Sequence, residues 1–270
     1  MAWSITITKI DAIRAVFALM ALAACSVAAR AQPVPAPPEG TALSKDCQTP
    51  GVTIVSERPL PNALAALRDR KVIKILTIGA SASAGMDPGS GGYQDIIEDV
   101  LEKTVSGLDV QIIDRGISGE LARDAAERLK TEVALTEPDL VLWQVGTNDA
   151  LAQIPVEEFT ETTTQAIRWL KERNVDVVLV GLQYVRNMRT DPHYQAIRAA
   201  ITRIAEAEKI LRIGRYEAME VTERVRQASS SERLSAFALT EAGYSCMAEY
   251  VVRAITSGIF LKRPNIQPRN

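Results

Sequence analysis

Apolar residues along the chain fall into two alternating patterns. Short continuous apolar runs, typical of strands that are buried on both faces, are separated by longer stretches in which apolar residues recur every three or four positions, as in amphipathic helices. The predicted strands are Val72–Ile78, Leu108–Ile113, Leu140–Val145, Val175–Val180 and Ile210–Ile213. The predicted helices are Asn62–Arg70, Tyr93–Leu101, Glu120–Leu135, Phe159–Leu170, Ile197–Ala205, Tyr216–Val225 and Thr240–Ile255.

Strands that alternate with helices predict a parallel sheet covered by helices on both faces. Five such units in about 200 residues predict a three-layer α/β/α domain with a five-stranded parallel sheet. The polar stretch Gln227–Arg233 is expected to be a linker between the last two helices.

The amino terminus has the pattern of an export signal. Lys9 and Arg14 precede the apolar run Ala15–Ala24, and Ala29–Ala31 is a small-x-small cleavage site. We expect cleavage after this site and a periplasmic or secreted protein. As an alternative, Leu22–Cys25 resembles the lipobox of bacterial lipoproteins, in which Cys25 would carry the lipid.

The remaining chain divides by composition. Residues 1–31 are the expected signal peptide, 32–46 a proline-rich linker, 47–262 the folded domain and 263–270 a polar tail. With Cys25 in the leader, Cys47 and Cys246 remain, and in an oxidising compartment they favour a disulfide over two free thiols.

Charge excludes one class of partner. Lys and Arg number 31 against 33 Asp and Glu, so no basic field favours nucleic acid. No cluster of His, Cys and carboxylates suggests a metal site, and no cofactor is expected.

Small polar residues follow three of the predicted strands: Ser81 after the first, Gly119 after the second and Asn148 after the third. In a parallel sheet these strand ends lie along one edge, where ligands bind. A serine there can act as a nucleophile, while the N–H groups of Ser81 and Gly119 and the Asn148 amide can bind an oxyanion. The first stretch is neither a P-loop, which needs Gly-Lys-Ser/Thr, nor a nucleophile elbow, which needs glycine two residues after the serine.

Three blocks of sequence around these residues resemble the SGNH/GDSL hydrolase family. They are Gly79–Gly85 (GASASAG), Ile117–Glu120 (ISGE) and Gly146–Asp149 (GTND). The resemblance places Ser81 at the nucleophile position, with Ala80 where aspartate is usual, and Gly119 and Asn148 at the oxyanion-hole positions. It implies a flavodoxin-like sheet and hydrolysis of a small-molecule, glycan or lipid acyl ester through an acyl-serine intermediate.

The fourth part of the family pattern is missing. Members carry Asp-x-x-His just before the last helix, often followed by Leu-Thr-x-x-Gly-Tyr. The frame Leu239–Tyr244 places Ser235 at the aspartate position and Ala238 at the histidine position. Neither side chain can act as the catalytic base or orient one.

His193 is the chain's one histidine, and it is the tentative replacement for that base because its loop follows the fourth strand. The alternative is structural: Asp191 caps a helix, Pro192 is its first residue and His193 lies on the surface.

Other residues near the blocks have two interpretations. Asp149 is expected to be a turn residue or a structural hydrogen bonder, and Trp143 is expected in the core. Ser83 is an alternative nucleophile, and Tyr184 either lines a pocket or packs in a loop. Two functions follow from the sequence: an ester hydrolase impaired by the missing pair, or a non-catalytic binding or interaction module of the cell envelope with the same fold.

Overall fold

Five parallel strands form the sheet at the centre of the computed structural model, which describes residues 43–80, 92–229 and 241–261. These residues all belong to one compact unit, 36–270. The strands are β1 (Val72–Gly79), β2 (Asp109–Gly116), β3 (Leu140–Gln144), β4 (Asp176–Val180) and β5 (Leu211–Ile213), in the order β2-β1-β3-β4-β5. The predicted α/β fold is therefore confirmed.

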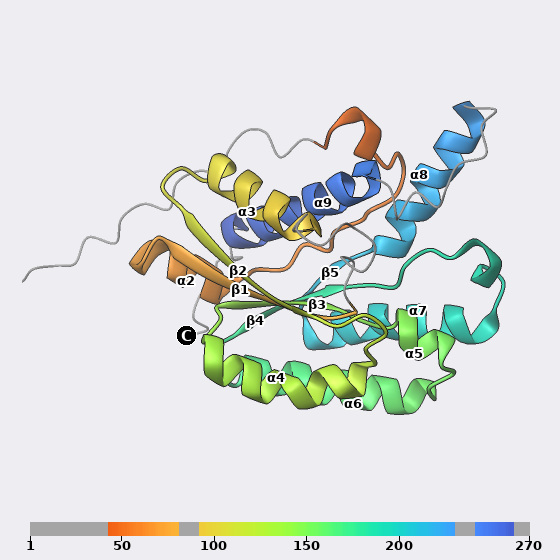
Figure 1. Ribbon diagram of the computed structural model, residues 1–270, viewed down its shortest axis with the longest axis horizontal. Coiled ribbons are helices and arrows are strands. Elements are labelled where there is room, and N and C mark those ends of the chain that lie inside the picture. Colours follow the sequence, from red (N-terminus) through yellow and green to blue (C-terminus); the bar gives the residue numbers. More distant parts are fainter. Residues whose placement is uncertain (1–42, 81–91, 230–240, 262–270) are drawn as a thin grey trace, which may run out of the picture. The chain divides into compact units, whose positions relative to one another are not determined.

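Helices cover both faces of the sheet (Figure 1). They are α2 (Pro61–Asp69), α3 (Gly92–Thr104), α4 (Ala122–Thr136), α5 (Thr147–Leu151), α6 (Val156–Lys171), α7 (Pro192–Glu208), α8 (Arg215–Ser229) and α9 (Glu241–Phe260), with the 3₁₀ turns η1 (Lys45–Cys47) and η2 (Arg186–Met188). Helices α2, α3 and α9 pack on one face, and α4, α6 and α7 on the other. Strand β1 contributes to both cores because its side chains alternate between faces: Ile75 joins the first core and Leu76 the second.

The predicted elements differ from the observed ones mainly at their ends. The expected linker Gln227–Arg233 is wrong in its first three residues, which continue α8, and its other residues lie outside the described part. Helix α9 runs on to Phe260, five residues beyond the prediction. The short helix α5 was not predicted, because five residues carry too little periodicity to show a helical pattern.

The predicted disulfide between Cys47 and Cys246 is present and joins η1 to α9. Beside it, the Tyr250 hydroxyl donates a hydrogen bond to the Cys47 carbonyl oxygen at 2.7 Å. The same amino-terminal segment runs antiparallel to β5, where Val55 pairs with Ile213. The open edge of β5 is thereby protected, which matters because exposed strand edges pair with other chains.

Of the helices that the structure describes, none combines the length and the apolar character needed to cross a bilayer.

Candidate active site

Hydrogen bonds tie the carboxyl ends of β1, β2 and β3 together. The Ile117 N–H donates to the Gly79 carbonyl oxygen at 3.0 Å, and the Ala80 N–H donates to the Gln144 carbonyl oxygen at 3.0 Å. The Gln144 side-chain amide in turn donates to the Ala80 carbonyl oxygen. The three sequence blocks therefore meet at one edge of the sheet, and the backbone is fixed up to Ala80, the residue before Ser81.

Gly79 is required for this arrangement. Its φ is +93°, and a Cβ atom built there would lie 2.1 Å from the Gln144 carbonyl oxygen. Any side chain would push β1 away from β3 at the point where the Ala80–Gln144 hydrogen bonds form. The glycine of the first block therefore serves the close approach of two strands.

Gly119 and Asn148 lie in loops that contact each other. The Asn148 Nδ2 atom donates a hydrogen bond to the Glu120 carbonyl oxygen at 3.0 Å, one residue after Gly119. Gly119 has a φ of +81°, and no described residue accepts a hydrogen bond from its N–H group. The structure thus brings together the two predicted oxyanion donors, one of them with an N–H group available.

Asp149 holds the same two loops from inside. Its side chain is 2% exposed, and Oδ1 accepts a hydrogen bond from the Ala122 N–H at the start of α4, at 2.9 Å. Burial raises the pKa of this carboxyl above its ordinary value, although backbone N–H groups, that of Ala122 first, oppose the shift. No described group hydrogen-bonds to Oδ2. The prediction that Asp149 is a structural hydrogen bonder is confirmed.

A groove of about 590 Å³ runs beside Gly119. Its lining residues are mostly polar: Ile117, Ser118, Gly119, Glu120, Asp124, Glu127, Arg128 and Thr131. Within it, Arg128 donates hydrogen bonds to both carboxylate oxygens of Glu120, at 2.7 and 3.1 Å. Half of its lining residues are charged, so a bound molecule would contact polar as well as apolar groups there.

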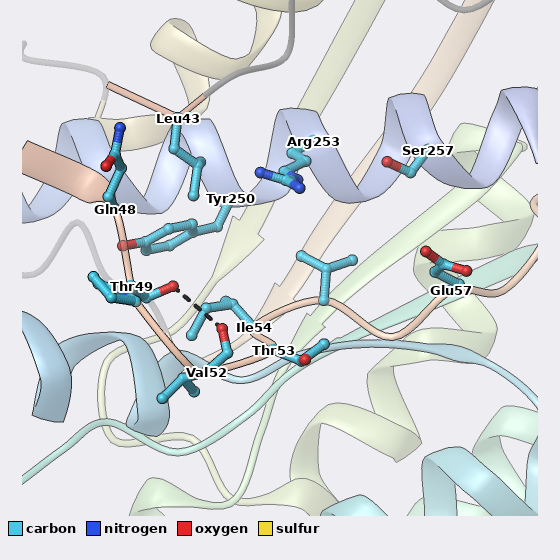
Figure 2. A pocket seen from close by; sticks show the side chains of 12 residues that line it. Leu43, Gln48, Thr49, Val52, Thr53, Ile54, Glu57, Tyr250, Arg253 and Ser257 are labelled. Carbon is cyan, nitrogen blue, oxygen red and sulfur yellow. Dashed lines mark hydrogen bonds between the residues drawn. The ribbon is translucent and has the colours of Figure 1, made fainter. Parts of the chain in front are cut away.

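A second cavity, of about 610 Å³, lies between α9 and the amino-terminal segment (Figure 2). Helix α9 contributes Tyr250, Arg253 and Ser257, and the segment opposite carries Thr53 and Glu57. None of its lining residues comes from the three blocks, so we do not place the active site there.

Buried polar groups that sequence reasoning missed lie at the ends of β3, β4 and β5. Arg215, the first residue of α8, is 5% exposed, and burial lowers the pKa of its guanidinium. Its Nη2 atom lies 3.5 Å from Gln183 Oε1. The Tyr93 hydroxyl donates to Gln144 Oε1 at 3.5 Å, and the Tyr194 hydroxyl donates to the Gln183 carbonyl oxygen at 2.6 Å. The one local signal was an arginine placed directly after a short strand and a glycine.

His193 is the second residue of α7, where the predicted helix start is confirmed. The Asp191 carboxylate accepts a hydrogen bond from the Tyr194 N–H at 2.7 Å, and Pro192 is the first helical residue. The histidine itself is half-buried, so the expectation of a surface side chain was wrong. Its Nε2 atom is buried without a hydrogen-bond partner in the described part of the chain. Its role as a base stays a prediction.

The remaining sequence predictions divide into described and undescribed residues. Trp143 is fully buried in the core, as expected. Tyr184 packs edge-on against Tyr216, with ring centres 5.2 Å apart, which favours the loop-packing interpretation. Ser81, Ser83, Ser235 and Ala238 lie outside the described residues. Within the described residues, no group of three or more His, Cys, Asp or Glu side chains could hold a metal ion.

Known esterases resemble this chain in sequence and in fold. An arylesterase from Vibrio mimicus is 30% identical over 115 residues, which is 42% of this chain and 56% of that protein. The chain therefore spans little more than half of that relative's length. Among solved structures, an acetylxylan esterase, Axe2, from Geobacillus stearothermophilus superposes with a TM-score of 0.55 and 20% identity, covering 68% of this chain and 94% of the other.

A further acetyl xylan esterase structure, AlAXEase, superposes with a TM-score of 0.58 at 18% identity and covers 68% of this chain and all of the other. At such identities, the structural likeness shows the shared fold. The model of the non-GDSL lipase-like family matches residues 46–260, which is most of the sequence. The resemblance to SGNH/GDSL hydrolases is thereby confirmed, and this chain belongs to the non-GDSL lipase-like family.

Proposed function

We propose that this protein is an exported serine ester hydrolase in which Ser81 is the nucleophile, and the Gly119 N–H and the Asn148 amide bind the oxyanion. The observation that carries the proposal is the set of hydrogen bonds that joins the three blocks at one sheet edge: Ile117 to Gly79, Ala80 to Gln144, and Asn148 to Glu120. These bonds hold both donors beside the strand end that leads into Ser81.

In the proposed reaction, the Ser81 hydroxyl attacks the ester carbonyl carbon and loses its proton to a base. The carbonyl oxygen becomes an oxyanion, which the Gly119 N–H and Asn148 amide stabilise. The alcohol leaves with a proton, and water then hydrolyses the acyl-serine. Loss of one oxyanion donor typically costs about 10²–10³ in rate, so Asn148→Ala should reduce turnover by that order.

Turnover is expected to be weak, because Ser235 and Ala238 occupy the positions of the family's aspartate and histidine. An oxyanion hole and substrate binding alone still leave about 10³–10⁴-fold acceleration over water. His193 is the proposed substitute base, since its Nε2 atom is buried and has no partner among the described residues. The same missing pair favours a second candidate function, a non-catalytic module of the cell envelope that binds its ligand without hydrolysing it.

The groove beside Gly119 supports a substrate class. With the acyl carbonyl at the oxyanion donors, we place the alcohol part of the ester in this groove, where charged and hydroxyl side chains would contact it. A polar alcohol such as a glycan fits this groove better than a lipid. The structural neighbours named as acetylxylan esterases agree with a short acyl group on a sugar.

The first experiment is hydrolysis of 4-nitrophenyl acetate by the purified chain lacking residues 1–31, beside Ser81→Ala. We expect activity that Ser81→Ala abolishes. Ser83→Ala is the matched control, because it removes a hydroxyl from the same block and should leave the rate unchanged. His193→Ala then tests the substitute base, and it should lower the rate.

Equal background rates for the wild type and Ser81→Ala would reject turnover and favour the binding module. The double change Ser235→Asp with Ala238→His then tests the alignment. It should create or raise esterase activity if those positions are the vacant ones. A folded double variant without any gain would contradict the alignment.

A further inference from the structure

Arg215 carries a buried positive charge that no described carboxylate neutralises. Its side chain is 5% exposed, and no ion pair found within residues 43–80, 92–229 and 241–261 includes it. Its Nη2 atom has one long contact, 3.5 Å to Gln183 Oε1, and its Nε atom is buried without a hydrogen-bond partner. A guanidinium has five N–H donors, so most of its capacity is unused by the described groups.

Two nearby arginines, both more exposed than Arg215, are paired with a carboxylate. Arg212, three residues earlier, lies 3.5 Å from a Glu217 carboxylate oxygen, and Arg198 lies 2.9 Å from the other oxygen of the same carboxylate. Burying an unpaired charge is costly, and a buried guanidinium is normally compensated by an anion with good geometry. No described group supplies the anion that would compensate the charge of Arg215, so such an anion would have to come from outside the described residues.

Three tyrosine hydroxyls and the Gln183 side chain lie near Arg215. The hydroxyls of Tyr93, Tyr194 and Tyr244 interact electrostatically with it. Burial raises the pKa of Tyr93 and of Tyr194 to about 12, so both are uncharged near neutral pH. They can donate or accept hydrogen bonds at the site, but they do not supply the missing negative charge.

Arg215 also lies on the functional edge of the sheet. It follows β5 by one glycine and begins α8, so it is at the carboxyl end of that strand. Tyr93 links it to the active site, because its hydroxyl lies 3.5 Å from Gln144 Oε1 and the same Gln144 amide holds the Ala80 carbonyl. Arg215 and the residue before Ser81 therefore lie at the same edge of the sheet, after β5 and β1 respectively.

We propose that Arg215 binds a carboxylate at this edge of the sheet. The proposal rests on the esterase function, because ester hydrolysis at Ser81 releases a carboxylate. A single planar carboxylate also matches one guanidinium through two parallel hydrogen bonds. The carboxylate has two sources with the same chemistry: the acid product, or a carboxylate that the ester substrate itself carries.

The first test measures binding and does not depend on turnover. Ser81→Ala protein is titrated with sodium acetate and sodium succinate at constant ionic strength, and the arginine Nε–H signals are followed by NMR. One Nε–H signal should shift and saturate. The shift should disappear in Ser81→Ala with Arg215→Gln, and it should persist with Arg212→Gln, the matched control whose arginine already has a carboxylate partner. No saturable shift, or the same shift without Arg215, would overturn the proposal.

The second test identifies the source of the carboxylate. Wild type, Arg215→Gln and Arg215→Lys are compared on 4-nitrophenyl acetate and mono-4-nitrophenyl succinate. A substrate carboxylate predicts a KM at least tenfold higher for the succinate ester alone in Arg215→Gln, with partial rescue in Arg215→Lys. A product carboxylate predicts competitive inhibition by acetate that Arg215→Gln relieves by at least tenfold.

Thermal unfolding separates binding from a structural role. Arg215→Gln should keep or raise the Tm, because it removes an unpaired buried charge. A lower Tm together with unchanged acetate binding would mean that the arginine is structural, which contradicts the proposal. If no variant hydrolyses either ester, the esterase function fails, and the NMR titration still decides whether Arg215 binds carboxylates.

Discussion

Two buried aspartates, Asp149 and Asp176, lie at opposite ends of the strands, and both accept hydrogen bonds from the start of a helix. Asp149 lies beyond the carboxyl end of β3, and Asp176 is the first residue of β4, at the opposite edge. Both side chains accept hydrogen bonds from N–H groups at the start of a helix, α4 for Asp149 and α2 for Asp176. Burial raises the pKa of both carboxyls.

The two carboxylates differ in how many hydrogen bonds they accept. Asp176 Oδ2 accepts from the N–H groups of Asn62 and Ala63, and Oδ1 accepts from the Asn62 side chain, all at 2.9 Å. Asp149 has one oxygen bound to the Ala122 N–H and the other without a described partner. Asp176, with both carboxylate oxygens hydrogen-bonded, stabilises the fold. Asp149, with one oxygen hydrogen-bonded to a described group, lies beside the proposed oxyanion donors.

Asp176→Ala should have the largest effect on stability. It removes three hydrogen bonds and leaves the N–H groups of Asn62 and Ala63 unpaired at the start of α2. We expect the free energy of unfolding to fall by about 3 kcal/mol, from roughly 1 kcal/mol per bond. Denaturant unfolding measures it, and turnover per folded molecule should stay the same. Loss of activity without loss of stability would contradict the assignment of Asp176 to stability and not to the active site.

The second-largest expected effect on the free energy of unfolding is its dependence on pH. Burial raises the pKa of Asp176 to about 6, so the folded state holds this proton more tightly than the unfolded chain does. The stabilisation that comes from this proton is therefore fully present below the pKa of the aspartate in the unfolded chain, and it is lost as the pH rises through 6. Linkage predicts a loss of about 2 kcal/mol between pH 4 and 7, which denaturant unfolding at several pH values measures. Asp176→Asn should flatten this slope, and an unchanged slope would show that another group carries it.

The sequence predicted Asp149 but not Asp176, for a physical reason. Asp149 follows a strand within a recognisable motif, so its neighbourhood is visible in adjacent residues. Asp176 begins an apolar run, and its partner Asn62 lies 114 residues away, so only the folded chain brings them together. Arg215 was missed for the same reason, because burial depends on elements that are distant in sequence.

The same distinction applies to the fold. Strand and helix positions followed from local periodicity, and the disulfide followed from having only two cysteines outside the expected signal peptide. The half-burial of His193 and the antiparallel pairing of Val55 with Ile213 depend on packing, and no local pattern marks them. The three-block alignment, in contrast, predicted correctly that the loops of Gly119 and Asn148 would meet.

Asp149→Ala should cost less stability than Asp176→Ala but more activity. It removes the hydrogen bond that fixes the start of α4, immediately after the loop of Gly119, so the free energy of unfolding should fall by about 1.5 kcal/mol. As a positioning residue, Asp149 should affect kcat rather than KM, by about tenfold, because the donors it holds act on the transition state. Asp149→Asn is the matched variant: it keeps an acceptor for the Ala122 N–H and should restore most of both losses. Equal losses in the two variants would show that the negative charge matters, which would make Asp149 more than a support for the loops.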